Sequence, residues 1–211
     1  MFKNLIILIP AYNEEKNIEN VIKKFKKYAE ILVVDDNSAD ATYKIAKINA
    51  HYLIKNKRNY GYDKTLRVGI KYIIQNIKKK FIITVDGDGQ HNPSAVKRFL
   101  LKIKNYDIIV GERNLLNRKI EKKISNISYK EIGIKDPLSG MKCYRTKSIK
   151  KYFGQLDKKF DYLGMFFIPW IKFLKISSIN IKVNKKNKPS SMGESTTLDK
   201  KFYNQFKKLI N

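Results

Sequence analysis

The sequence predicts an α/β protein with a Rossmann-like, doubly wound and mostly parallel sheet that carries helices on both faces. Two observations predict this fold class. Short runs rich in Ile and Val alternate with longer basic stretches of helical spacing, which is the rhythm of βαβ units with right-handed crossovers. The 211 residues also fit one domain, and 43% of them are hydrophobic, which is enough for a packed core.

Four short apolar runs are expected to form strands that are buried on both faces, because they are rich in β-branched residues. They are residues 5–9, 31–34, 81–85 and 108–110. Four stretches of helical spacing are expected to form the crossovers, and they are residues 14–28, 39–49, 64–77 and 93–103. Asn92 and Pro93 supply the start of the last helix, as an N-cap followed by proline at the first helical position.

The alternation breaks down beyond residue 107. Residues 114–130 are polar and basic, which predicts a mobile segment or short helices. Further along we expect a strand at 141–144, an apolar helix at 162–174, a strand at 176–183 and a loop at 185–195.

The predicted domain organisation is a single domain over residues 1–196, followed by an amphipathic helix over 197–211. The helix could pack on the domain or lie at a membrane interface with its Lys side chains toward lipid headgroups. Its apolar face carries Leu198, Phe202, Phe206, Leu209 and Ile210.

The charge of the chain favours anionic partners. Lys and Arg number 45 against 19 Asp and Glu, which gives a net charge of +26. Only six of the basic residues are Arg, and the Lys are spread along the chain instead of clustered on one stripe, which favours a diffusely solvated coat of Lys over a nucleic-acid surface. The single Cys143 excludes an internal disulfide and favours a reducing compartment.

Polar and acidic clusters follow three of the predicted strands. Residues 10–15 follow the first strand, residues 35–38 the second, and residues 86–91 the strand at 81–85. Ligands of open parallel sheets bind at the carboxyl ends of the strands. These clusters are therefore expected to converge on one edge of the sheet and to hold the chemistry.

Asp86 and Asp88 are the strongest candidates for a metal site. Two residues apart in extended backbone, their carboxylates point the same way, and paired oxygens of this kind suit Mg²⁺ or Mn²⁺ bridged to phosphate. The alternative is an acidic surface turn. The acidic residues at 35–40 and 13–15 have a similar alternative as helix caps.

Three motifs in this order resemble glycosyltransferase family 2, and within it the polyprenyl-phosphate synthases that make dolichol-phosphate mannose or glucose. They are IPAYNEE at 9–15, VVDDNSAD at 33–40 and VDGDGQHNP at 85–93. Further matches are GER at 111–113, DPLSGM at 136–141 and GES at 193–195. The resemblance spans residues 4–196.

The resemblance implies a GT-A fold, with a nucleotide-sugar half over residues 1–112 and an acceptor half over 113–196. It also implies a role for individual residues. The residues implied to bind the nucleotide sugar are Pro10, Ala11, Tyr12, Glu14, Asp36, Asp86 and Asp88. The residues implied to hold Mg²⁺ or Mn²⁺ are Asp86, Asp88 and Gln90. The residues implied to bind the acceptor phosphate are Arg113, Arg118, Lys122 and Ser125. The residues implied to take part in catalysis are Asp88, Asp136 and Arg113.

Two stretches depart from the family pattern. The loop at 59–65 resembles the turn Asn-x-Gly-x-Gly-x-Ala, but it carries Asp63 in place of the second glycine and Thr65 in place of alanine. The motif at 193–195 is followed by Thr196, where the family has a basic residue.

The implied reaction is an inverting transfer of a hexose from a UDP- or GDP-linked sugar to a polyprenyl phosphate, such as a dolichyl or undecaprenyl phosphate. An ionised lipid phosphate needs cations to position it more than it needs a base, and the chain beyond residue 110 is rich in cations. The implied location is peripheral, on the cytoplasmic face of a membrane. The alternatives are a family 2 enzyme that acts on a glycan or protein hydroxyl, which needs a base, and a non-enzymatic basic module that binds RNA or a membrane. If the chain is the polyprenyl-phosphate transferase, no nucleic-acid partner is expected.

Overall fold

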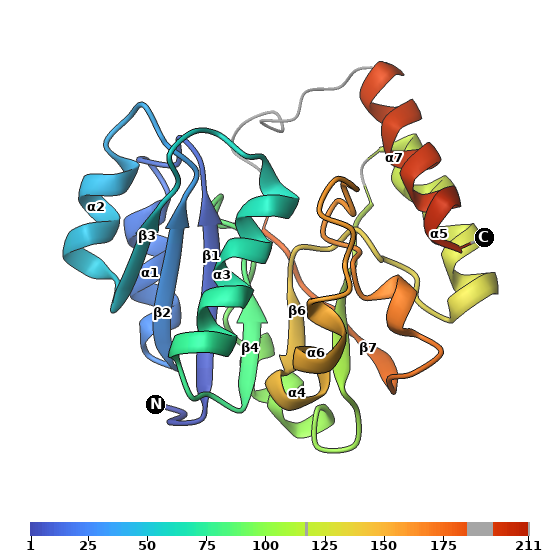
Figure 1. The fold of residues 1–211 in the computed structure, drawn as a ribbon, viewed down its shortest axis with the longest axis horizontal. Helices are drawn as coiled ribbons and strands as arrows, with labels where there is room; N and C mark the ends of the chain where they lie inside the picture. Colours follow the sequence, from blue (N-terminus) through green and yellow to red (C-terminus); the bar gives the residue numbers. More distant parts are fainter. Residues whose placement is uncertain (117, 185–195, 211) are drawn as a thin grey trace.

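A computed structural model of the chain describes residues 1–116, 118–184 and 196–210, and these residues form one seven-stranded sheet (Figure 1). The strand order is β3-β2-β1-β4-β6-β5-β7, and every neighbouring pair is parallel except the two made by β6. The strands are β1 (Leu5–Ala11), β2 (Glu30–Asp35), β3 (Tyr52–Lys55), β4 (Phe81–Thr84), β5 (Ile108–Arg113), β6 (Lys142–Arg145) and β7 (Ile176–Ile181).

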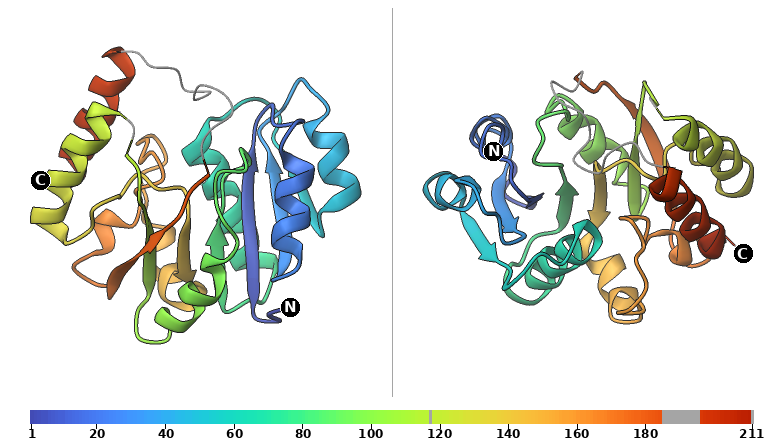
Figure 2. Two further views of the ribbon diagram at one scale, coloured as in Figure 1. Left: turned by 180° about the vertical axis from the view of Figure 1, so that it is seen from behind. Right: turned by 90° about the horizontal axis from the view of Figure 1, so that it is seen from above.

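Helices cover both faces of this sheet. Seen from above in Figure 2, α1 and α4 lie on one side of the sheet, and α3 and α6 lie on the other. The helices are α1 (Ile18–Lys26), α2 (Thr42–Asn49), α3 (Tyr62–Asn76), α4 (Ala95–Lys102), α5 (Lys119–Ile132), α6 (Thr146–Phe153) and α7 (Thr196–Ile210), with a 3-10 turn, η1, at Ile168–Trp170.

The first strand shows how the sheet divides the core. Leu5, Ile7 and Ile9 belong to the apolar cluster on the α1 and α4 side, and Ile6 and Leu8 belong to the cluster on the α3 and α6 side. A strand buried on both faces needs a continuous apolar run, and this is the pattern that the sequence shows. The predicted α/β fold class is confirmed.

Two expectations for the second half are wrong. The apolar stretch at 162–174 forms turns and the short η1 instead of a helix, because Leu163 (φ 51°) and Gly164 (φ 75°) have left-handed backbone and Pro169 follows. Most of the stretch at 114–130 belongs to one 14-residue helix, α5, which continues to Ile132 and ends at the left-handed Gly133. The loop expected at 185–195 lies outside the described residues.

The C-terminal helix α7 packs against α5 and η1, and Figures 1 and 2 show α5 and α7 side by side at one end of the sheet. Phe202 and Phe206 are buried there, and Arg118 at the start of α5 forms an ion pair with Asp199 of α7. Among the described residues, no helix combines the length and the apolar character that crossing a bilayer requires.

Candidate active site

The predicted polar clusters meet at the carboxyl edge of the sheet, because β2, β1 and β4 are adjacent parallel strands. The loops after β1 and β4 are in contact, since a β-carbon added to Gly87 would lie 3.3 Å from the carbonyl oxygen of Pro10 and 3.4 Å from Cγ of Glu14. Ala11 is buried at the end of β1, and the ring of Tyr12 beside it is 44% exposed. The topology therefore brings the first and third motifs together.

Hydrogen bonds join the loop after β1 to the loop after β2. The backbone N–H of Asn13 donates to Oγ of Ser38 (2.9 Å), and the N–H of Ala39 donates back to Oδ1 of Asn13 (2.9 Å). The N–H of Glu14 donates to Oγ1 of Thr42 (2.7 Å). The polar side chains thus bond backbone groups of the neighbouring segment and hold the two loops together.

Asp36 is buried and holds the loop that follows β3. Its carboxylate accepts hydrogen bonds from the side-chain amide of Asn56 (2.7 Å) and from the backbone N–H groups of Tyr60 (2.9 Å) and Gly61 (2.8 Å). A carboxylate that accepts several hydrogen bonds keeps its orientation. The contact with a nucleobase that the resemblance implies for Asp36 stays a prediction.

Asp86 is held from three sides. The phenol of Tyr62 donates to Oδ1 (2.9 Å), Nε2 of His91 lies 3.8 Å from Oδ2, and a β-carbon added to Gly140 would lie 2.2 Å from both oxygens. The side chain is nevertheless 30% exposed. The carboxylate is therefore oriented by the protein and open toward solvent.

The residues around Asp86 fit a hard divalent cation that is also held by its substrate. Asp88 is partly exposed and accepts a hydrogen bond from the N–H of Gln90 (3.1 Å), which closes the turn after β4. No group of three or more His, Cys, Asp or Glu that could enclose a metal occurs among the described residues. Mg²⁺ is typically held by one or two carboxylates, with waters and phosphates in the other positions, so two carboxylates and an amide suffice.

The turn at 136–140 connects this edge to Arg113 at the end of β5. One end of the turn, Gly140, lies against Asp86. At the other end Asp136 is only 3% exposed and accepts hydrogen bonds from Nε (2.7 Å) and Nη2 (3.0 Å) of Arg113. The turn is held in this place because Thr84 of β4 donates to the carbonyl oxygen of Gly140 (2.6 Å).

Arg113 remains a cation in this environment. Burial alone would lower its pKa, but the hydrogen bonds and charge of Asp136, together with Glu121 at 3.2 Å, raise the pKa of Arg113 above its ordinary value. The structure shows an ion pair that is largely buried and that lies next to the candidate site.

The other residues expected to hold an acceptor phosphate lie on or just before α5. Arg118 pairs with Asp199 and lies over the ring of Phe202, 5.1 Å from its centroid. Lys122 is exposed and Ser125 is partly buried. Arg118 is thus engaged with α7, whereas Lys122 extends toward solvent.

Lys142 is a charged residue near the site to which the sequence analysis assigned no role. It lies on β6 with 2% exposure, its ammonium donates to the carbonyl oxygen of Ser139, and it lies over the ring of Phe167. A lysine inside the predicted apolar strand at 141–144 is the signal that could have drawn attention to it. Burial lowers the pKa of Lys142 to about 8, although the charges of Asp136 and Asp86 act in the opposite direction.

The lowered pKa predicts how stability changes with pH. Below pH 8 the buried ammonium destabilises the folded state, and this cost disappears as the pH rises from about 8 toward the ordinary value of 10.5, because the unfolded chain still binds the proton. Relative to Lys142→Met, the free energy of unfolding of the wild type should increase by up to about 3 kcal/mol as the pH rises over this range from about 8 to 10.5. Urea unfolding at pH 7.5 and pH 10 measures the difference. An exposed control, Lys97→Met, should show no such change, and a difference between wild type and Lys142→Met that is independent of pH would contradict the assignment.

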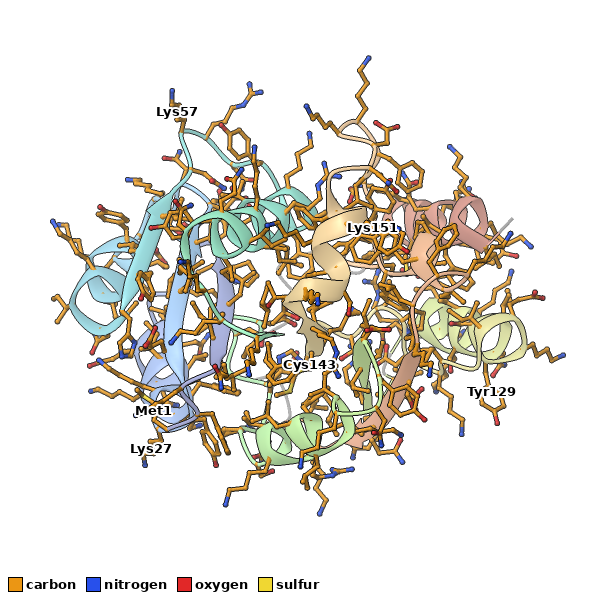
Figure 3. The ribbon with its side chains drawn as sticks, turned by 60° about the horizontal axis from the view of Figure 1, so that its bottom comes forward. Met1, Lys27, Lys57, Tyr129, Cys143 and Lys151 are labelled. Atoms are coloured by element: carbon orange, nitrogen blue, oxygen red, sulfur yellow. The ribbon has the colours of Figure 1, made fainter. Side chains whose placement is uncertain are left out.

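The lysines labelled in Figure 3 belong to separate elements. Lys27 follows α1, Lys57 follows β3 and Lys151 lies on α6, and all three are exposed. Cys143 lies on β6 and is fully buried, as a small core residue, and burial raises the pKa of its thiol. These three lysines therefore lie on different parts of the surface, as a solvated coat of Lys requires.

The mostly parallel seven-stranded sheet, with β6 antiparallel and helices on both faces, has the GT-A fold. A crystal structure of glucosyl-3-phosphoglycerate synthase from Mycobacterium tuberculosis with Mn²⁺ and UDP-glucose matches with a TM-score of 0.69, covering 99% of this chain and 79% of that chain at 15% identity. At this identity the match shows the fold alone.

The sequence profile of glycosyl transferase family 2 matches residues 6–175. An uncharacterised protein of Methanocaldococcus jannaschii is 34% identical over 84% of this chain and 80% of its own length. A UDP-N-acetylglucosamine–dolichyl-phosphate N-acetylglucosaminyltransferase of Methanococcus voltae is 29% identical over 74% of this chain and 75% of its own length. The chain belongs to glycosyltransferase family 2 and is a glycosyltransferase. It covers less than two thirds of some relatives, such as 47% of the dolichol-phosphate mannosyltransferase of Pyrococcus furiosus (27% identical over 68% of this chain).

Proposed function

We propose that this enzyme moves a hexose, with inversion, from a UDP- or GDP-linked sugar to a polyprenyl phosphate, and that it uses Mg²⁺ or Mn²⁺. The observation that carries the proposal is the turn at 136–140. This turn joins the partly exposed Asp86, through Gly140, to the buried ion pair of Asp136 and Arg113. With a cation bound at Asp86, an anionic donor would meet a positive charge on one side of the turn. The guanidinium of Arg113 is the cationic group on the other side, toward which an anionic acceptor would lie.

The donor half of the proposal rests on the loops after β1, β2 and β4. Pro10, Ala11, Tyr12, Glu14 and Asp36 would border the nucleotide. Asp86, Asp88 and Gln90 would hold the cation. When bound, the cation would neutralise the charge that develops on the departing nucleoside diphosphate. We also propose the division into a nucleotide-sugar half (1–112) and an acceptor half (113–196), followed by the helix at 197–211.

A phosphate acceptor is favoured over a hydroxyl acceptor by the state of Asp136. Both of its oxygens already accept hydrogen bonds from Arg113, so it is poorly placed to remove a proton from a hydroxyl. Arg113, with Arg118, Lys122 and Ser125 nearby on the chain, would instead position an acceptor phosphate that is already ionised. The relatives named as dolichyl-phosphate N-acetylglucosaminyltransferase and dolichol-phosphate mannosyltransferase support the same acceptor class.

The test is a transfer assay with radiolabelled UDP- and GDP-hexoses and Mn²⁺, in which a short-chain polyprenyl phosphate competes with free polyprenol, oligosaccharide and protein acceptors. The proposal expects label in the polyprenyl-phosphate product alone. Label in an oligosaccharide or protein, with none in the lipid phosphate, would favour the hydroxyl acceptor.

We further propose that the enzyme acts peripherally at the cytoplasmic membrane face, with the outer side of α7 toward anionic lipid. The apolar side chains Phe202 and Phe206 face the domain, whereas Lys200 and Lys208 are exposed. Because one Lys near an anionic surface contributes about 1 kcal/mol, the double change Lys200→Gln and Lys208→Gln should weaken binding to phosphatidylserine vesicles by about tenfold or more.

Flotation of the vesicles measures this binding. A control with the same change of net charge, Lys24→Gln with Lys27→Gln at the end of α1, should bind nearly as the wild type does. Equal losses for the two double variants would show that binding depends on net charge alone, and would refute a specific role of α7.

A further inference from the structure

The loop between β3 and α3, together with the first turn of α3, is one of the two stretches where the sequence departs from the family pattern. It contacts two carboxylates of the candidate site. The N–H groups of Tyr60 and Gly61 donate to the two oxygens of Asp36, at 2.9 and 2.8 Å. The next residue, Tyr62, donates its phenol hydrogen to Oδ1 of Asp86, at 2.9 Å. Consecutive residues therefore connect the carboxylate at the end of β2 with the carboxylate after β4.

Asp63, which stands where the family has glycine, fastens the same loop to the segment before η1. Its Oδ1 accepts a hydrogen bond from the N–H of Gly164 (3.0 Å), and its Oδ2 lies 3.5 Å from Nε of Arg67. Asp63 is 4% exposed, so this attachment lies inside the protein.

The ring of Tyr62 is confined by this attachment. Gly164 has φ +75°, and a β-carbon added to it would lie 3.0 Å from Cε1 of Tyr62. The backbone of Gly164 thus lies on the ring, and the bond to Asp63 keeps it there. Because the ring is confined, its hydroxyl is held at hydrogen-bond distance from Oδ1 of Asp86.

We propose that Tyr62 is a positioning residue that orients Asp86 for the cation, and that Asp63 and Gly164 hold Tyr62 in place. This inference rests on the proposed function, because it takes Asp86 as a ligand. A carboxylate oxygen that accepts one hydrogen bond keeps a lone pair for a metal. With Gly140 on the other side, Asp86 is oriented before the cation arrives. Removal of such an outer-shell partner typically weakens metal binding by 10- to 100-fold.

Tyr62→Phe tests the proposal, because it removes the hydroxyl and keeps the ring. We would titrate the full chain with Mn²⁺ and follow the loss of the EPR signal of free Mn²⁺, alone and with UDP or GDP present. The dissociation constant for Mn²⁺ should rise at least about tenfold, with an unchanged melting temperature and an unchanged KM for the acceptor. Tyr60→Phe, in the same loop, is the matched control and should stay within about twofold of wild type, since no hydrogen bond of its hydroxyl is found among the described residues.

The possible outcomes separate the two proposals. If the wild type binds Mn²⁺, Asp88→Ala does not, and Tyr62→Phe binds as tightly as the wild type, then the positioning role of Tyr62 is wrong and the proposed donor site stands. If the wild type binds no Mn²⁺ with either nucleotide, both proposals are refuted. A fall in affinity that Tyr60→Phe reproduces in full would also overturn the role of Tyr62.

Discussion

Asp88→Ala is expected to reduce sugar transfer by about 1000-fold while the protein remains folded. The loss follows because Asp88 would hold the cation that neutralises the charge developing on the leaving diphosphate. Removing a group that stabilises such charge typically lowers the rate by about 100- to 1000-fold. The fold should survive, because Asp88 lies in a partly exposed turn after β4 and outside both apolar clusters. Single-turnover transfer rates and circular dichroism measure the two effects.

Glu131→Ala provides the matched control, because it removes an exposed carboxylate from α5. Its transfer rate and melting temperature should equal those of the wild type. Transfer by Asp88→Ala at more than a tenth of the wild-type rate would remove Asp88 from the metal site.

Gly140→Ala is expected to reduce transfer by at least about 100-fold, which is a large effect for one methyl group. The added β-carbon would lie 2.2 Å from both oxygens of Asp86, so either that carboxylate or the turn at 136–140 must move. Because the same turn carries Asp136, the partner of Arg113, a shift would disturb both sides of the site. Overpacking of this kind also costs about 1–3 kcal/mol of stability.

Transfer rates and urea unfolding of Gly140→Ala measure these two losses. Gly154→Ala is the control for the change itself, because nothing lies within 4 Å of a β-carbon at that position and its φ is −69°. It should leave transfer unchanged and leave stability equal or slightly raised. Normal transfer by Gly140→Ala would show that the contact between the turn and Asp86 does not matter for the reaction.

Local sequence pattern explains which elements could be predicted. The buried strands of the first half are continuous apolar runs, so their position follows from composition alone. The edge strand β3 was missed because its four residues are half-buried or exposed, and α6 was missed because Ile149 is its one fully buried residue. The stretch at 162–174 was misassigned because apolar composition reports burial and not backbone conformation, and here Leu163 and Gly164 are left-handed.

The same reasoning separates the parts of the site. Asp86 and Asp88 could be placed at the edge of the sheet because parallel strands end together. The contacts of Tyr62 and Lys142 join segments that are distant in the sequence. Lys142 lies on β6, which inserts antiparallel between β4 and β5 and thereby places the preceding turn at 136–140 next to Asp86. No short-range pattern predicts that insertion, so the contact of Gly140 with Asp86 became visible only in three dimensions.

The most direct test of the central claim, a cation held by Asp86 and Asp88 that in turn holds a nucleoside diphosphate, is calorimetry of UDP and GDP binding to the wild type with Mn²⁺ and with EDTA. The account predicts that one of the two nucleotides binds with Mn²⁺ and at least about tenfold more weakly with EDTA, and that Asp88→Ala removes this difference. Equal affinity with Mn²⁺ and with EDTA, or no binding of either nucleotide, would contradict it.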